Sequence, residues 1–335
     1  MTFMSTTGQP PVSAPGPSAP LRMTPGRWVA LAFGVPVALA LIGWTGFSLV
    51  SAVARGSYPF SYPVPVDDGQ VTANVNVGNV TVRQASGSSA ELTGVVQYGL
   101  FRPGISESTT AGAVSVVVNC DGAVNSNCGA NATLDVPAKV GVTVSSAGGD
   151  IGISGFSSGM TLSTEGGNLT ASNLGGTLRL DTGGGNLTGT GLTGTIDITT
   201  EGGNIDASNL DGSGTMRLDT GGGNLTGTAL TGDLQLATEG GNVDAAAVAS
   251  QQVLIQSGGG DVTLTFTQPP RDLQITADGG NVTVVLPPGD TRYDISTPDT
   301  QGGNVSYPST LASSTSHDTI TVDSGGGDIT ISQGG

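Results

Sequence analysis

The feature that most constrains this chain is a short unit that recurs ten times between residues 140 and 335. Its marker is a Gly-Gly pair followed by Asn or Asp, and successive markers lie 18 to 24 residues apart. A period in this range is typical of stacked-repeat proteins. The third marker residues are Asp150, Asn168, Asn186, Asn204, Asn224, Asn242, Asp261, Asn281, Asn304 and Asp328.

Apolar positions predict what each unit folds into. An aliphatic residue follows every marker, and apolar residues stand eight and six positions before it, as Leu178 and Leu180 do for Asn186. Only the unit before Asn304 is out of register. Apolar residues at period 2 indicate strands with one buried face. We therefore expect an all-β fold, a β-solenoid of about ten coils of 18 to 24 residues. At about 4.8 Å per coil, it would be roughly 48 Å long.

The polar positions of the unit predict how its turns are built. We expect the Gly pair to supply the positive φ that a tight reversal needs. The marker Asn and Asp side chains are expected to form a hydrogen-bonded ladder from coil to coil. A second, inward-facing polar ladder is expected four residues before the marker, at Thr164, Thr182, Thr200, Thr220, Thr238 and Ser257.

The N-terminal segments have a different composition. Residues 1–27 are rich in Pro, Ser, Thr and Gly and contain no acid, which predicts a disordered cytoplasmic tail. Residues 28–54 carry no charge and are long enough for one transmembrane helix. Positive charge precedes this segment, so the later residues are expected outside the cell. A cleaved signal peptide is the alternative, since Ala52-Val53-Ala54 resembles a cleavage site.

Two segments separate the predicted anchor from the repeats. Residues 55–69 are rich in Pro and are expected to be a linker. Residues 70–139 alternate less regularly and predict an irregular β cap region that covers one edge of the repeat array at 140–335. Cys120 and Cys128, the only cysteines, lie in a Gly/Asn-rich loop on the exported side, which favours a disulfide.

Charge and chemistry narrow the function classes. Residues 1–55 carry three Arg and no acid, whereas the remainder carries 7 basic and 26 acidic residues. An acidic exterior argues against nucleic-acid binding. The only histidine, His317, lies in a Ser/Thr-rich loop that marks no catalytic triad. We expect no catalytic residues, no cofactor and no metal site, so the chain is not predicted to be an enzyme.

Two sets of charged residues in the array have a structural interpretation. Glu165, Glu201 and Glu239 fall on alternate coils, about 9.6 Å apart, too far for one calcium ion to bridge. Arg179, Asp197 and Arg217 are expected to stack on adjacent coils with alternating sign. Such exposed ion pairs contribute about 0.2 to 1 kcal/mol each.

The chain resembles a family of bacterial membrane-anchored proteins that carry a β-strand-repeat domain of unknown function and are described as putative adhesins. The resemblance spans most of residues 40–335 and is carried by five features: the anchor leading into Leu49-Val50-Ser51, Gly-Asn-Val-Thr-Val at 78–82, the Cys120 and Cys128 loop, Leu134-Asp135-Val136-Pro137, and the Gly-Gly-Asn/Asp units. It implies a repeat architecture at the cell surface and brings no functional residues with it.

These observations lead to two hypotheses. The first is a non-catalytic cell-surface protein, anchored once in the bacterial membrane, that serves as an adhesin or as an envelope structural or display protein. Its partner would be the membrane and an unknown extracellular protein or glycan surface. The alternative is an envelope-stress sensor or scaffold that signals through the cytoplasmic tail. Deleting residues 1–27 distinguishes them, because only a signalling protein should lose its output.

Overall fold

The structure is a computed structural model. It describes residues 33–39, 41–42, 55–76, 78–99, 101–110, 112–120, 128–298 and 300–334. The chain divides into two compact units, Met1–Ser51 and Ala52–Gly335, each described by itself. All strands belong to the second unit, which is an all-β structure with one 3-10 turn.

The strands are short and follow one another closely. Their bounds are β1 Gly56–Val64, β2 Gln70–Val75, β3 Asn79–Ala85, β4 Ala90–Tyr98, β5 Gly104–Thr110, β6 Ala113–Asn119, β7 Gly129–Pro137, β8 Gly141–Ser146, β9 Ile151–Ser154, β10 Met160–Thr164, β11 Leu169–Ser172, β12 Gly175–Thr182, β13 Leu187–Thr190, β14 Thr193–Thr200, β15 Ile205–Thr220, β16 Leu225–Thr238, β17 Val243–Val248, β18 Gln252–Ser257, β19 Val262–Phe266, β20 Asp272–Ala277, β21 Val282–Leu286, β22 Asp294–Ser296, β23 Val305–Ser306, η1 Ser309–Leu311, β24 Thr319–Ser324 and β25 Ile329–Gln333.

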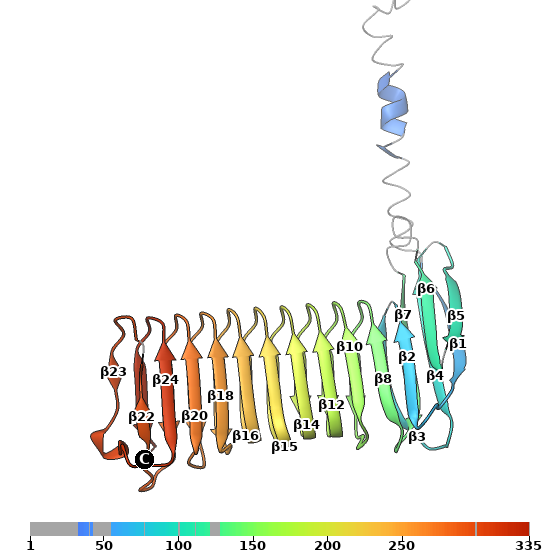
Figure 1. Cartoon of the computed structure of the whole chain (residues 1–335). Helices are drawn as coiled ribbons and strands as arrows, with labels where there is room; N and C mark the ends of the chain where they lie inside the picture. The colour runs from blue at the N-terminus through green and yellow to red at the C-terminus, as the bar shows by residue number, and fades with distance from the viewer. Residues whose placement is uncertain are drawn as a thin grey trace, which may run out of the picture. The chain divides into compact units, whose positions relative to one another are not determined.

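Parallel pairing between alternate strands organises these elements into two series. β8, β10, β12 and β14 pair in one series, whereas β9, β11 and β13 pair in the other. β15 and β16 are long and contribute one half to each series. We call the series that contains β10 wall 1 and the series that contains β11 wall 2. One rung is a strand of wall 1, the marker turn and the following strand of wall 2; Figure 1 shows the rungs side by side from β8 to β20.

The core lies between the two walls and is built from the predicted apolar positions. The paired apolar residues are buried before nine of the ten markers, as at Leu178 and Leu180, which are 1% and 0% exposed. The aliphatic residue after the marker is also buried in nine of the ten units. Val305 is the exception at 38% exposure, because its strand β23 lies in the outermost rung and pairs with β25 alone among the described strands. Strands with one buried face are therefore confirmed.

The order of rungs departs from the order of the chain at the C-terminal end. β24 pairs with β20 on one side and β22 on the other, and β25 likewise lies between β21 and β23 (Figure 1). The last rung in sequence is thus the last but one in space. Its residues Ile320, Val322, Ile329 and Ile331 are at most 1% exposed. The more apolar rung takes the position with two neighbours, and the unit before Asn304, which is out of register in the sequence, forms the outermost rung.

A comparable rearrangement occurs at the other end. β2 pairs in parallel with β8 and with β6, and β3 pairs in parallel with β9 and with β7. The regular stack therefore extends beyond the predicted boundary at residue 140 to include β2 and β3. β5 joins β6, and β1 and β7 join β4, in antiparallel pairs.

The predicted linker at 55–69 differs from the observed structure, because Gly56–Val64 forms β1. Its inward residues Phe60 and Val64 are buried, and all nine residues pair with β4. The prolines that suggested a linker are tolerated because β1 is an edge strand, where a missing N–H breaks no ladder. An apolar alternation was present in this segment and was outweighed by its proline content.

The first unit is described only in part. Residues 33–39 and 41–42 are helical and exposed. Within the described residues, no helix has the length and apolar character required to cross a membrane. The predicted tail at 1–27 and most of the predicted anchor at 28–54 lie outside the described residues. The anchor is therefore not supported by the structure and stays a prediction.

Candidate functional site

The candidate site is the side of the stack where wall 1 turns into wall 2, since the marker residues and most of the charged columns meet there. All ten marker Asn and Asp residues are exposed at this turn. They form one continuous ladder in which each step is a backbone N–H donating to a side-chain oxygen. Where the acceptor is an aspartate and the donor residue an asparagine, a side-chain-to-side-chain bond is added, at Asn168, Asn281 and Asn304. The backbone N–H of Asn186 donates to Oδ1 of Asn168 at 3.0 Å, and Asn204 donates to Asn186 at 2.9 Å.

The ladder follows the spatial order of the rungs. It begins at Asn79, whose Oδ1 accepts from the backbone N–H of Asp150 at 2.9 Å. At the other end, Asp328 donates to Asn281 and accepts from Asn304. Each side chain thus satisfies a backbone donor that the turn leaves free. Asn79 was not among the predicted ladder residues, although the Gly78-Asn79-Val80 sequence resembles the marker.

A second ladder of hydroxyl groups lies behind the first and is buried. Thr200 is 1% exposed. Its Oγ1 donates to the carbonyl oxygen of Gly185 in the neighbouring rung and accepts from the N–H of Gly203. The same two bonds recur at Thr164, Thr182, Thr220 and Thr238, whereas Ser257 donates to Gly260 of its own rung. These hydroxyls join adjacent turns in the interior, where no water is needed to satisfy them.

The Gly pair has a different role from the expected one. Among the marker glycines, only Gly302 and Gly326 have a positive φ. The second glycine is instead required by close approach of the backbones. A Cβ on Gly203 would overlap the carbonyl oxygen of Gly185, whereas a Cβ on Gly202 would meet only one atom at 3.9 Å. The prediction of positive φ was therefore wrong at eight of the ten markers, where the distance between stacked backbones rather than chain reversal sets the requirement.

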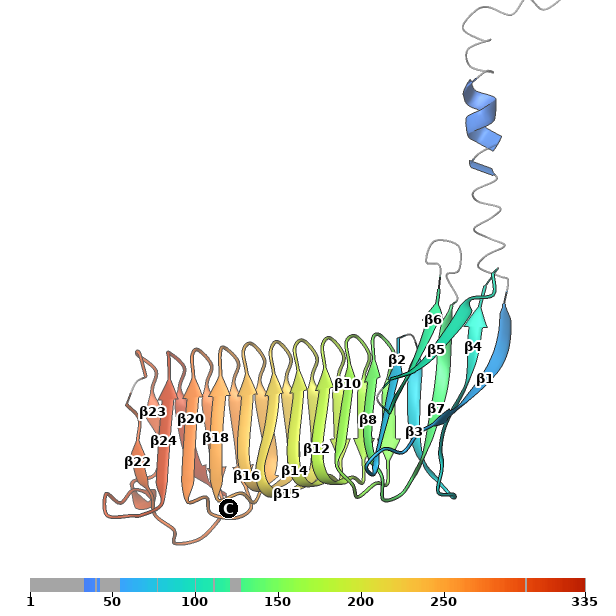
Figure 2. The same ribbon diagram turned by 45° about the vertical axis from the view of Figure 1, so that its right-hand side comes forward.

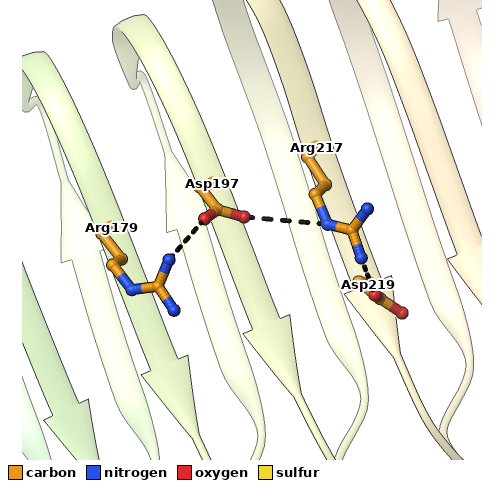
Figure 3. Close-up of polar contacts among 4 residues, drawn as sticks. All are labelled: Arg179, Asp197, Arg217 and Asp219. Carbon is orange, nitrogen blue, oxygen red and sulfur yellow. Dashed lines mark hydrogen bonds and ion pairs between the residues drawn. The ribbon is translucent and has the colours of Figure 1, made fainter.

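Charged side chains project from the outer face of wall 1 in the columns beside this turn. Arg179, Asp197 and Arg217 lie on consecutive rungs, as predicted from their spacing (Figure 3). Arg179 Nη1 is 3.0 Å from Asp197 Oδ2, and Arg217 Nε is 4.0 Å from Asp197 Oδ1. Arg217 also pairs with Asp219 on its own strand. The side chains of both arginines are at least half exposed, so salt weakens these pairs.

Polar grooves run along the same side. One has a volume of about 600 Å³ and is lined by Ser145, Ser163, Glu165, Asp181 and Glu201 among others. Its acids alternate between two columns, since Asp181 is in register with Ser163 rather than with Glu165. Within the described residues, no three His, Cys, Asp or Glu side chains form a group that could hold a metal ion. The arrangement offers a row of hydrogen-bonding and acidic groups rather than one reaction centre.

The remaining predicted residues lie elsewhere. Cys120 and Cys128 form a disulfide, as expected, with Cα atoms 5.7 Å apart, joining the end of β6 to the start of β7. His317 is exposed in the segment before β24. Burial, and secondarily the charge of Asp318, raises the pKa of Tyr293 to about 12. Tyr293 is a core residue of the C-terminal rung that the sequence did not single out.

Comparison with known proteins provides structural neighbours but no family. No known protein family and no curated protein matches the sequence. A putative adhesin from Bacteroides fragilis is 12% identical, with 83% of this chain and 97% of that chain covered and a TM-score of 0.34. A putative cell adhesion protein from Clostridium sporogenes is 12% identical, with 83% and 100% covered and a TM-score of 0.24. A putative lipid binding protein from Parabacteroides distasonis is 6% identical, with 85% and 98% covered and a TM-score of 0.32. At TM-scores this low, the similarity assigns neither a fold nor a function to this chain.

Proposed function

We propose that the protein is a non-catalytic cell-surface β-solenoid that recognises an external surface, as an adhesin or as a structural display protein of the bacterial envelope. The observation that carries the proposal is the repetition of exposed polar side chains in register from rung to rung. Arg179, Asp197 and Arg217 occupy equivalent positions on consecutive rungs. Equivalent positions recur at about 4.8 Å along such a stack.

A repeated surface of this kind suits recognition of an extended or repetitive partner. Each contact with an exposed side chain is weak, but contacts made by successive rungs act together once the first has formed. Catalysis would instead need groups that converge on one reacting atom. In the described part of the chain, the polar columns run parallel to one another along the stack. Parallel in-register pairing of alternate strands supports the solenoid part of the proposal.

The cell-surface location rests on sequence. The uncharged segment at 28–54 follows Arg22 and Arg27, and the acidic residues all come later, which places residues after 54 outside the membrane under the positive-inside rule. The disulfide between Cys120 and Cys128 supports the same location, because disulfides persist in the oxidising environment outside the membrane. Protease treatment of intact cells should remove the repeat array while sparing a fragment that contains the N-terminus.

Attachment of cells tests the surface role. The bacterium that carries the gene would be compared with a deletion strain and with strains complemented by the full chain or by a chain lacking residues 1–27. We expect the deletion to reduce attachment to glycan-coated surfaces, protein-coated surfaces or other cells, and both complemented strains to recover it. Unchanged attachment of the deletion strain on every surface would refute the proposal. Recovery that requires residues 1–27 would favour a signalling role for the tail.

A further inference from the structure

The end of the stack that carries the first strands differs from every other part of the surface. Wall 1 ends at β5 and wall 2 at β1, and each pairs with one described strand, β6 and β4 respectively (Figure 2). A groove of about 510 Å³ runs along β1 and the start of β5 and is lined by Tyr58, Phe60, Tyr62, Arg102, Pro103 and Ile105 among others. This volume falls within the range of small-ligand sites, about 300 to 1,000 Å³.

The groove is lined by three of the chain's few aromatic residues: Tyr58 and Tyr62, which are partly buried, and Phe60, which is buried. The aromatic residues after position 55 are Tyr58, Phe60, Tyr62, Tyr98, Phe101, Phe156, Phe266, Tyr293 and Tyr307. The first five of these belong to β1 or to the end of β4 and the loop after it. By contrast, Phe156, Phe266 and Tyr293 are at most 3% exposed.

The rings of β1 form a row because alternate residues of a strand point to one side. Tyr58 and Tyr62 are partly buried and flank Phe60, and the centroids of Phe60 and Tyr62 are 5.7 Å apart. From Tyr58 to Tyr62 the row covers about 13 Å, at about 3.3 Å for each residue step. The accessible aromatic surface of this row is supplied by Tyr58 and Tyr62, because Phe60 is only 8% exposed and belongs to the core.

Arg102 supplies the one charge among the side chains that line the groove. Its Cζ lies 3.9 Å from the centroid of the Tyr58 ring, and the hydroxyl of Tyr58 donates to the carbonyl oxygen of Pro103 at 2.8 Å. The guanidinium thus lies over the ring, while none of its N–H groups has an acceptor among the described residues. A stacked guanidinium is prearranged to bind a carboxylate with two parallel hydrogen bonds.

We propose that this groove binds a short stretch of an acidic polysaccharide, with the C–H face of a sugar ring against Tyr62 and a sugar carboxylate on Arg102. Among the described residues no acid forms an ion pair with Arg102, although the net charge of the chain is −16, and a free guanidinium complements an anionic ligand. The inference rests on the proposed surface role, because acidic polysaccharides are components of cell surfaces.

An extended peptide suits the groove less well. A peptide that adds a strand to a sheet edge needs backbone donors and acceptors along that edge. Pro59 and Pro63 leave β1 without an N–H at two of its nine positions.

Calorimetric titration of the purified full-length chain tests the proposal. The probes are oligomers of galacturonate and of mannuronate, hyaluronan tetrasaccharide, and methyl-esterified oligogalacturonate, which keeps the sugar rings without the charge. At least one acidic oligomer should bind. Arg102→Gln should weaken that binding about tenfold or more, with partial recovery in Arg102→Lys, and Tyr62→Leu should weaken it by removing the flat ring. Arg292→Gln, an exposed arginine at the opposite end of the stack, is the matched control and should bind normally.

Several results would overturn the inference. They are the absence of binding by every acidic oligomer at millimolar concentration, equal binding of the esterified and free oligogalacturonate, unchanged affinity in Arg102→Gln, and binding of extended peptides alone. If Tyr62→Leu fails to fold, the affinities of Arg102→Gln and Arg292→Gln for the acidic oligomer are sufficient to test the proposal. Because binding is read on the isolated protein, the groove can fail this test while cell attachment persists, and the two proposals remain separable.

Discussion

The close approach of adjacent rungs can be tested at a single pair of glycines. A Cβ on Gly241 would overlap the carbonyl oxygen of Gly223 in the neighbouring rung, whereas a Cβ on Gly240 would meet no atom within 4 Å. Neither residue has a positive φ, so alanine is not excluded at either position by its own backbone conformation. The variants Gly241→Ala and Gly240→Ala therefore differ only in what the added methyl group meets.

The expected difference follows from three terms. Forcing a methyl group into a filled site costs about 1 to 3 kcal/mol. Moving Gly241 away also strains the hydrogen bond from its N–H to Thr238 Oγ1, 2.9 Å, and the bond from the N–H of Asn242 to Asn224 Oδ1, 2.9 Å. Each such bond is worth about 1 kcal/mol. We expect Gly241→Ala to lower the free energy of unfolding by about 3 to 5 kcal/mol, combining the packing range and two bonds.

Gly240→Ala should be neutral or stabilise the fold by up to about 1 kcal/mol, because it restricts only the unfolded chain. Urea unfolding of the purified full-length variants, followed by far-UV circular dichroism, measures both values. Hydrogen exchange at the amides of neighbouring rungs would locate the loss. Equal destabilisation by the two substitutions would refute the idea that interstrand distance, rather than chain flexibility, requires glycine at the second marker position.

Three further outcomes are expected. Thr200→Val should lower the free energy of unfolding, measured by urea titration, by about 1 to 3 kcal/mol, because two buried backbone groups lose their hydrogen-bond partner. Thr199→Val, at the neighbouring and partly exposed position, should have a much smaller effect. Reduction of the Cys120–Cys128 disulfide should lower stability by about 2.5 kcal/mol, since it closes a short loop, and calorimetry with and without reductant would detect this. The pKa of Tyr293 is about 12 in the folded chain and about 10 in the unfolded chain, so the free energy of unfolding should fall as pH rises between these values. Tyr293→Phe should remove the contribution of this group to the alkaline loss of stability. An unchanged dependence of stability on pH in this variant would contradict the prediction.

The turn-side site was predictable to the extent that it repeats. The marker spacing located the ladder residues and the buried hydroxyls, because every rung must satisfy the same backbone groups. The opposing charges of Arg179 and Asp197 were likewise expected from a shared position in the unit. The groove beside Tyr58 was not predicted, because the proline content of residues 55–69 outweighed their apolar alternation. The groove's other lining residues, Arg102 and Ile105, come from a later segment.

What the sequence determined by itself is the rung. Three local features define it: alternating apolar residues, a marker at a regular interval and buried hydroxyl groups. Each of them specifies the structure of a single rung. Only the tertiary structure decided the order in which rungs stack. All rungs offer similar backbone edges, so hydrogen-bond pairing alone does not select the order of the rungs. β24 and β25 lie between the preceding rung and the rung of β22 and β23, because their isoleucines and valines bury most apolar surface with a neighbour on both sides. The reason for the second marker glycine is also visible only in the tertiary structure, because the contact that excludes a side chain there comes from the adjacent rung.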